Sequence, residues 1–443
     1  MEKSISEGSQ PQNQSINQLQ KLVEDNSFFF NPRDENRFLY YIFKNGGTDD
    51  KKKQNALKAF RLGYDVRYFE ATKVLLSEFK FISRIVRYKE KDGLLQVKFQ
   101  NGFTGSIDPH MLADNPDDLY NALQSYLLVK INKSSNDWEI IDAYPIEPPN
   151  NVEVAKSLFE LADAEHSTAQ LLLSAFGYDT AKMSDEDALL TLPRLMPLFV
   201  SPYSKRRFNI IEISNPGTGK TSLFTLLQEI FNFRYYTEPP TYANLIYDAR
   251  NNIMGAVYLS KGLIFDEIQT WKDGNNISQI GAINATLSTG IENCLWTRGA
   301  GTETDAAVLH SCLPIIYAGN PVSSLDSFGV QRFSEDGLSE FLDKYEVFTK
   351  AILDRIHIIH VTEKKTYDQI GSRRVLYPSV LKSLIQLVQD KLNRQTDFVD
   401  CGNFKSRRHE QAIDVELFLQ AVDVNFDKDK VCQMLEHYLR IFR

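Results

Sequence analysis

The sequence is poor in cysteine and has no excess of positive charge. Its four cysteines, Cys294, Cys312, Cys401 and Cys432, form no CxxC pair and have no histidine at metal-ligand spacing. This pattern argues against a zinc site or a disulfide framework and predicts a protein of the reducing cytoplasm. The net charge of −8 argues against a passive nucleic-acid coat, which would be basic. It leaves open a ring that is acidic outside and basic along its channel.

Long apolar segments are also missing. The longest apolar stretch, residues 188–200, is interrupted by Pro193, Arg194 and Pro197 and is too short to cross a bilayer, so no membrane association is expected. Residues 1–20 are polar and lack an apolar core, which excludes a signal peptide and predicts a disordered tail. A chain of 443 residues has room for about two to four domains.

Residues 21–148 contain two different patterns. Apolar residues at three- and four-residue spacing predict an N-terminal helical region over residues 21–78. Residues 79–148 instead predict three strands, a helix and two more strands, which is the element order of an OB-fold barrel. The expected elements are strands 81–88, 94–100 and 103–107, a helix over 114–125, and strands 126–131 and 138–146.

Basic residues are concentrated on the first hairpin of this predicted barrel. They are Lys80, Arg84, Arg87, Lys89, Lys91 and Lys98. Tyr88 and Phe99 lie among them. Basic side chains that bind phosphates and aromatic rings that stack on bases are typical of a DNA-binding surface. The alternative is a solvated hairpin whose aromatic residues fill the barrel, and for Phe99 we favour this alternative.

Residues 149–363 predict an α/β motor, and residues 364–443 predict a C-terminal helical lid. Pro148 and Pro149 mark the linker that precedes the motor. The pattern over residues 152–199 is largely helical. The tail predicts helices from Pro378 onward, with a last helix over residues 429–442. This segment fits a lid that closes over nucleotide, either alone or extended by a winged helix.

A phosphate-binding loop directly follows the apolar strand 207–213. Its residues are Ser214, Asn215, Pro216, Gly217, Thr218, Gly219, Lys220 and Thr221, and a helical pattern begins after them. A strand, a glycine-rich loop and a helix are the context that this motif requires. The glycines let backbone N–H groups approach the phosphates, Lys220 reaches the β- and γ-phosphates, and Thr221 ligates Mg²⁺. Ser214 replaces the first glycine of the motif and is small enough to keep the loop.

Two further strands end in residues suited to ATP hydrolysis. The strand over residues 262–265 is followed by Asp266, expected to hold Mg²⁺ through water, and by Glu267, expected to activate the attacking water. The strand over residues 313–319 is followed by Asn320. In AAA+ proteins an amide at this position, called sensor 1, orients the water, although Asn is also a common turn former. Together these motifs predict an ATPase that uses ATP and Mg²⁺.

Two arginines are candidates for completing the site. Arg355 lies between a helix and a strand, where the AAA+ pattern places an arginine that points into the ATP of the neighbouring subunit. This role implies a ring, and a surface salt bridge is the competing interpretation. Arg408, in the predicted lid, is a weaker candidate for a nucleotide contact. His357 and His360 lie among isoleucines without metal spacing and are interpreted as structural.

The sequence resembles the BrxL-like family, the Lon-related AAA+ proteins of BREX phage-exclusion systems. The matching segments, in the same order along the chain, are Leu192-Pro-Arg-Leu-Met-Pro-Leu198, the phosphate loop, Tyr242-Ala-Asn-Leu-Ile-Tyr247, Phe265-Asp-Glu267, Thr297-Arg-Gly299, Ala318-Gly-Asn320 and Leu353-Asp-Arg355. The resemblance covers roughly residues 70 to 443. Longer members of the family carry a Lon-type protease domain that is not found here.

BrxL-like proteins are similar in plan to MCM replicative helicases. The resemblance therefore implies a homo-hexamer, single or stacked as a double ring, that encircles DNA or translocates on it. Arg298 is a further candidate DNA contact in the motor channel, although Glu303 and Asp305 follow it in place of lysines. The sequence favours a ring-forming DNA-binding ATPase, a helicase or translocase in phage defence or mobile-element replication. Two alternatives remain open: a protein-remodelling ATPase, for which Tyr258 is a weak pore-loop candidate, and a DNA-clamping scaffold assembled by ATP.

Overall fold

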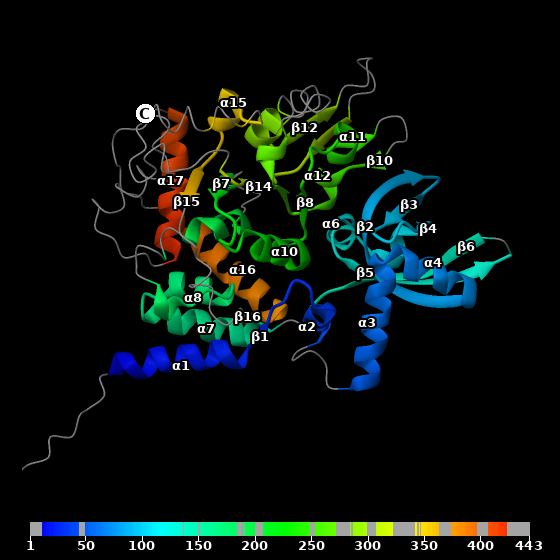
Figure 1. Ribbon diagram of the computed structural model, residues 1–443, viewed down its shortest axis with the longest axis horizontal. Helices are drawn as coiled ribbons and strands as arrows, with labels where there is room; N and C mark the ends of the chain where they lie inside the picture. Colours follow the sequence, from blue (N-terminus) through cyan, green and yellow to red (C-terminus); the bar gives the residue numbers. More distant parts are fainter. Residues whose placement is uncertain are drawn as a thin grey trace, which may run out of the picture.

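The structure is a computed structural model, in which a mostly β region lies beside a larger α/β region (Figure 1). The described residues are 11–43, 49–135, 137–148, 151–183, 188, 191–199, 207–248, 253–271, 284, 287–298, 307–321, 342, 345, 347–362, 374–396 and 406–422. None of the helices in this part of the chain is long and apolar enough to cross a membrane.

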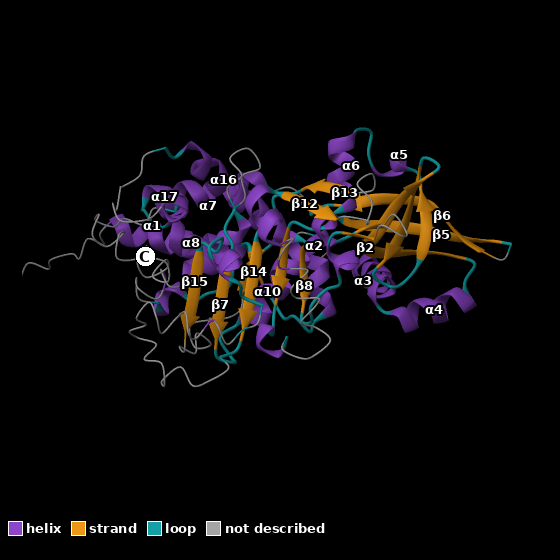
Figure 2. Ribbon diagram, turned by 90° about the horizontal axis from the view of Figure 1, so that it is seen from above, coloured by secondary structure: helices purple, strands orange, loops and turns teal. Residues whose placement is uncertain are grey.

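Five parallel strands form the centre of the α/β region, and Figure 2 shows them side by side. Their order in the sheet is β15-β7-β14-β11-β8. Their bounds are Ile210–Ser214 for β7, Phe233–Tyr236 for β8, Gly262–Phe265 for β11, Ile315–Gly319 for β14 and Ile358–Thr362 for β15. Every residue of β7, β11 and β14 is buried, as expected for parallel strands that are covered on both faces.

The two faces of this sheet contribute alternate residues to two cores. Ile210 and Ile316 join a core with longer helices, whereas Ile211 and Tyr317 join a core under shorter ones. The longer helices are α7 (Val152–Ala164), α8 (Thr168–Ala175), α10 (Lys220–Phe231), α16 (Pro378–Arg394) and α17 (Ser406–Ala421). The shorter ones are α11 (Tyr242–Leu245), α12 (Ala256–Leu259) and α15 (Lys350–Leu353). The predicted α/β motor is thus confirmed as a mixed α/β fold with a parallel sheet.

The second region follows the predicted order of elements. Its strands are β2 (Glu78–Lys91), β3 (Leu94–Phe99), β4 (Thr104–Ile107), β5 (Tyr126–Ser134) and β6 (Asp137–Ile146), with α5 (Pro109–Leu112) and α6 (Pro116–Leu123) between β4 and β5. The pairing order is β4-β3-β2-β5-β6, and β4 also lies against β6. We call residues 78–146 the barrel. Their order of elements is confirmed, and the OB-fold assignment stays a prediction.

The helical N-terminal region packs on the barrel. It comprises η1 (Glu35–Phe38), α2 (Leu39–Ile42), α3 (Asp50–Tyr64) and α4 (Val66–Leu75), and α3 lies along β2. The α/β region also contributes a strand to the barrel sheet. In the hairpin of β9 (Tyr247–Asp248) and β10 (Ile253–Met254), Met254 pairs with Tyr88 of β2. The two regions are therefore joined through backbone hydrogen bonds as well as side chains.

The prediction of a disordered tail over residues 1–20 is wrong for residues 11–20. These belong to α1 (Pro11–Asp25), and Leu19, Leu22 and Val23 pack on the core of the α/β region. The next strand, β1 (Ser27–Phe29), pairs with β16 (Arg374–Leu376). One apolar stripe is enough to hold an otherwise polar helix against a core. Residues 1–10 and the predicted helix over 429–442 lie outside the described residues.

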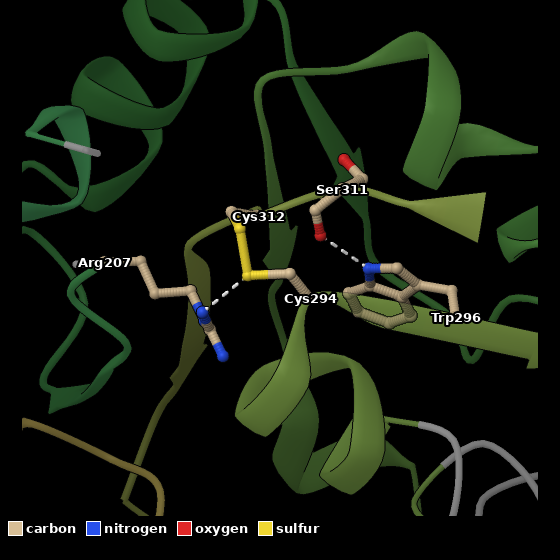
Figure 3. Close-up of a disulfide and its surroundings, with 5 residues drawn as sticks. All are labelled: Arg207, Cys294, Trp296, Ser311 and Cys312. Atoms are coloured by element: carbon tan, nitrogen blue, oxygen red, sulfur yellow. Dashed lines mark hydrogen bonds between the residues drawn. A yellow bond between two sulfur atoms is a disulfide. The ribbon is translucent and has the colours of Figure 1, made fainter. Parts of the chain in front are cut away.

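The expectation that the cysteines form no disulfide is also wrong. Cys294 and Cys312 are bonded to each other, and Figure 3 shows Arg207 donating to the Cys294 sulfur at 2.9 Å. Strands β12 (Leu295–Arg298) and β13 (Ala307–His310) pair antiparallel, so the hairpin brings together two cysteines that are 18 positions apart. The prediction of a reducing cytoplasm, which rested on unpaired cysteines, loses that support.

Candidate functional site: a phosphate loop and a basic hollow

The phosphate loop lies at the carboxyl end of β7, and α10 begins directly after it. Gly217 and Gly219 have positive φ angles of 92° and 84°, a region that side chains with a Cβ rarely enter. A Cβ built on Gly217 would meet no atom within 4 Å, so glycine is required there by backbone conformation rather than by lack of space. Asn215 and Pro216 form the start of the loop. Thr221, in the first turn of α10, is exposed.

The Lys220 ammonium is held by groups from two strands. It donates to the Ser214 carbonyl at 2.6 Å, the Ser214 hydroxyl at 3.0 Å and the Asn320 side-chain oxygen at 3.1 Å. Burial lowers the pKa of Lys220, and the carboxylates of Glu212 and Asp266 act in the opposite direction. The predicted loop lysine and the predicted sensor 1 amide are thus in direct contact.

Ser214 is more than a tolerated replacement for glycine. Its hydroxyl lies 3.2 Å from a carboxylate oxygen of Glu212 and 2.8 Å from the Thr218 hydroxyl, in addition to Lys220. A hydroxyl has one proton to donate, so donation to Glu212 leaves Ser214 to accept from both Thr218 and Lys220. A glycine could make none of these side-chain contacts. Ser214 therefore links the strand to the loop.

The two carboxylates after β11 differ in their surroundings. Asp266 is buried and accepts from the Tyr235 hydroxyl at 2.6 Å, a contact that together with burial raises the pKa of Tyr235. Glu267 is half-buried and has a φ of 54°, an unusual backbone conformation for a non-glycine residue. Such conformations cluster at functional sites, where the surrounding structure holds them.

Asn320 connects Lys220 with Glu267. Its side-chain nitrogen donates to a Glu267 carboxylate oxygen at 3.3 Å, and its backbone N–H donates to Gln269 at 2.9 Å. The Gln269 amide also donates to Glu267. We did not predict Gln269 from the sequence, because it belongs to no recognised motif and its partners come from another strand.

A buried ion pair beneath the loop was also missed. Arg194 and Glu212 are 1% and 0% exposed, and their side chains meet at 2.6 Å. Arg194 also donates to the Thr218 carbonyl of the phosphate loop at 3.0 Å. The ion pair thus supports the loop from the side of the sheet. The segment 192–198 did carry the family resemblance, but nothing in the sequence pointed to Glu212 as its partner.

Arg355 lies at the opposite edge of the sheet from the phosphate loop. Its carbonyl accepts from Asn209, the residue before β7, at 3.3 Å. Strands rise about 3.3 Å per residue, so the five residues of β7 place this point roughly 16 Å from the start of the loop. Its guanidinium pairs with Glu292, which is the arrangement of the competing salt-bridge interpretation.

Three other predicted residues have only partial descriptions. Arg298 lies in β12 and Arg408 in α17, and the side chains of both lie outside the described part of the chain. The same holds for the side chain of His360 in β15. His357, by contrast, is buried and accepts the Asn209 backbone N–H at 3.2 Å, so its structural interpretation is confirmed.

The basic residues of the barrel do not lie in one cluster. Arg87 and Lys98 are paired across β2 and β3, and with Lys89 they line a hollow of about 440 Å³. The hollow is further lined by Gln96, Thr104, Ser106 and, from the α/β region, Ile253. Lys80 is exposed but lies on the part of β2 that pairs with β5. Phe99 is 1% exposed and fills the barrel, as expected.

The prediction that Arg84 contacts DNA is wrong. Its side chain is 8% exposed, stacks on Tyr126 at 4.0 Å, and donates to the backbone carbonyls of Gln228 and Glu229 at the end of α10. The last carbonyls of a helix have no partner within the helix, and an arginine satisfies both their hydrogen bonds and the helix dipole. Arg37 adds a salt bridge to Glu229 at 2.6 Å.

Tyr258 does not occupy an exposed loop either. Its ring lies 5.7 Å from that of Tyr88 and 5.1 Å from that of Tyr120, and its carbonyl accepts from Gln124 at 2.9 Å. These contacts hold the barrel against the α/β region. The pore-loop interpretation of Tyr258 therefore has no support from its position.

The family model described as "Lon-like protease BrxL-like, ATPase domain" matches residues 139–365, just over half of the chain.

Two viral proteins are similar over nearly their whole length. Uncharacterized protein 440 of Sulfolobus islandicus rod-shaped virus 1 is 55% identical over 96% of this chain and 97% of its own. Uncharacterized protein ORF426 of Acidianus filamentous virus 1 is 28% identical over 93% and 97%. Among solved structures, a full-length MCM homolog from Methanopyrus kandleri matches with a TM-score of 0.45 and 11% identity, covering 82% of this chain and 78% of that one.

Proposed function

This chain belongs to the BrxL-like family of AAA+ ATPases, and from that premise we propose that it forms a ring that binds DNA and acts as a helicase or translocase. The observation that carries the proposal is the basic hollow on the barrel, joined to the ATPase region through the pairing of β10 with β2. A hollow of three cations among polar side chains suits a phosphate backbone.

The residues at the carboxyl edge of the sheet suit ATP and Mg²⁺. Among the described residues there is no cluster of three or more His, Cys, Asp or Glu side chains that could hold a metal by itself. Magnesium usually takes one or two protein ligands and completes its shell with water and phosphate oxygens, so the Thr221 hydroxyl, with Asp266 acting through water, would be enough to hold it. When bound, the ion would neutralise charge on the phosphates.

The residues around the phosphate loop would bind the phosphates, accept a proton and orient the attacking water. Asn215 to Thr221 would hold the phosphates, with the Lys220 ammonium leaving its present oxygen partners for phosphate oxygens of higher charge. Glu267 would accept the proton of the attacking water, and Asn320, already bonded to Glu267, would orient that water. Arg408 stays a weaker candidate for a contact from the lid.

The position of Arg355 supports a ring. About 16 Å of strand separates its backbone from the loop of its own chain, which favours a role at the nucleotide of a neighbouring copy. In that arrangement Arg355 would exchange Glu292 for the developing charge on the transferred phosphate. A homo-hexamer, single or stacked, is the assembly we propose, with Arg298 as a candidate contact along the channel.

The relatives bear on the biological role. The two relatives described above come from viruses, which favours replication of a mobile element over defence against one. The rival proposal of a protein-remodelling ATPase loses its pore-loop candidate, since Tyr258 is packed between Tyr88 and Tyr120. The scaffold proposal is disfavoured because Glu267 and Asn320 lie together, as hydrolysis would require. A cytoplasmic location stays a prediction.

A salt titration of DNA affinity tests the proposal. Each phosphate contact should contribute a slope of about −0.9 on duplex and about −0.7 on single strands in a plot of log affinity against log salt. Arg87→Gln with Lys98→Gln should therefore flatten the slope by roughly 1.4 to 1.8. Lys130→Gln is the matched control, because Lys130 lies on β5 of the same barrel and pairs with Glu78 at 2.7 Å. A wild-type slope in the double variant would exclude the hollow as the DNA site.

A further inference from the structure

A second cavity, of about 1000 Å³, lies where three parts of the molecule meet. It is lined by Arg84 from β2 of the barrel, by Lys261 just before β11, and by Lys382 from α16. It is distinct from the phosphate loop. Arg84 contacts the far end of α10, at Gln228, and a helix rises about 1.5 Å per residue, which puts that contact roughly 12 Å along the helix from Lys220.

Three cations line this cavity, of which Arg84 is buried, Lys382 half-buried and Lys261 exposed. Lys382 lies 5.2 Å from the ring of Tyr41 and donates to its hydroxyl at 3.4 Å, and Lys261 lies 5.5 Å from the ring of Tyr120. The positive charges are close enough to repel one another. Burial, with Arg84 as a further cause, lowers the pKa of Lys382 to about 8, and burial together with Lys382 lowers that of Lys261.

The cavity is also lined by acidic residues. They are Asp114, Asp118 and Glu147, and all three are exposed. Exposed carboxylates are hydrated and screened, so they offset the charge of the buried Arg84 and the half-buried Lys382 only weakly. Glu147 opposes the lowering of the Lys382 pKa without reversing it. An anion in the cavity would therefore meet positive charge at Arg84 and Lys382 that the acidic residues offset only in part.

Two buried polar atoms at this cavity have no partner among the described residues. They are the Nε of Arg84 and the side-chain oxygen of Gln124, and the two residues are only 8% and 4% exposed. A buried polar group without a hydrogen bond is costly, and such groups call for an explanation. One atom is a donor and the other an acceptor, so a single ligand with an anionic group and a hydroxyl or amino group satisfies both.

We propose that this cavity binds a small phosphate-bearing anion, such as pyrophosphate or the phosphates of a free nucleotide. Lys382 and Lys261 contact the phosphate oxygens, the Nε of Arg84 donates to the same group, and Gln124 accepts a hydrogen bond from the rest of the ligand. The cavity volume is at the upper end of the roughly 300 to 1,000 Å³ of small-molecule sites. This inference does not depend on DNA binding or on hydrolysis.

Calorimetry with pyrophosphate on Lys220→Ala protein provides the test, because this substitution removes the main predicted phosphate contact of the phosphate loop. We expect binding to remain in this background, and Lys382→Gln to weaken it about tenfold or more through loss of a charge-assisted hydrogen bond. Lys391→Gln is the matched control. Lys391 lies on the same helix but pairs with Asp163 at 2.5 Å, so its removal should leave the affinity unchanged.

Chemical modification gives a second measurement on folded protein. With its pKa lowered to about 8, the Lys382 amine is about half unprotonated at pH 8 and should react with an acylating reagent. Lys391, held in an ion pair with Asp163, should react more slowly. Pyrophosphate should protect Lys382 and leave Lys391 unchanged. The proposal is overturned if no pyrophosphate binds in the Lys220→Ala background or if Lys382→Gln binds it as tightly. It is also overturned if only a DNA oligonucleotide, and not pyrophosphate, protects Lys382.

Discussion

The phosphate loop and the basic hollow use charge in opposite ways. At the loop, Arg194, Glu212 and Lys220 are buried, and each is held by partners from neighbouring segments at fixed distances. In the hollow, Arg87 and Lys98 lie on the surface of a small sheet with only the pairing of β2 and β3 to set their spacing. Buried charges are costly and must be placed accurately, which suits chemistry. Exposed charges cost little free energy and need no exact position, which suits binding to a phosphate backbone regardless of base sequence.

Arg355→Ala should have the largest effect on ATP hydrolysis. It tests whether the site at the phosphate loop is complete within one chain. ATP should still bind, and hydrolysis should fall on the order of 10³-fold or more, as for other arginines supplied in trans. Steady-state ATPase assays beside nucleotide-binding measurements test this. Mixing the variant with Lys220→Ala protein should restore part of the activity at hybrid interfaces. Full activity of Arg355→Ala alone would contradict the ring.

Glu267→Gln tests the chemistry within the loop region. The amide keeps the shape of the side chain and its contacts with Asn320 and Gln269, but it cannot accept the proton of water. Turnover should fall by about 10² to 10⁴-fold while ATP affinity stays near the wild-type value. Single-turnover hydrolysis separates the two quantities. Unchanged turnover would remove Glu267 from its role as general base.

Arg194→Met asks what buried charge contributes to stability. It leaves Glu212 buried without its partner, and breaking such a pair costs about 3–5 kcal/mol in the free energy of unfolding. Denaturant unfolding measures the loss, and Arg194→Met with Glu212→Gln should recover part of it. Breaking the exposed pair of Lys130 and Glu78 provides the reference and should cost about 0–1 kcal/mol.

Lys98→Gln should have the smallest effect on stability. Lys98 is exposed, and surface substitutions of this kind usually change the free energy of unfolding by no more than about 0.5 kcal/mol. The same variant should still flatten the salt dependence of DNA affinity by about one contact. A stability loss as large as that of Arg194→Met would mean that the hollow is part of a packed interface, and the contrast between the two regions would fail.

Much of the nucleotide region could be predicted because its signals are local. The strands before Ser214 and Asp266 are rich in isoleucine, leucine and phenylalanine, and the glycines and the lysine of the loop follow at fixed spacing. The strand order of the barrel could be predicted for a similar reason. Its turns at Asp92-Gly93 and Asn101-Gly102 separate alternating segments, and both glycines have positive φ.

The parts that could not be predicted depend on contacts between distant segments. Arg84 is basic and lies on the same strand as Arg87, but its neighbours are the carbonyls of α10, about 144 positions away. A register irregularity between Ile85 and Arg87 also changes which side chains share a face of β2. The polar composition of α1 hid the stripe that contains Leu19 and Leu22.

The contacts of Arg37 and Arg84 with the end of α10 have a mechanical consequence. This helix of 12 residues is a rod of about 18 Å with the phosphate loop at its other end. Because α10 is stiff and is bonded at both ends, a movement of one end moves the other end as well. A shift of the loop during a nucleotide cycle would therefore move the barrel by a similar amount. The pairing of β10 with β2 would keep the barrel attached to the α/β region during that movement.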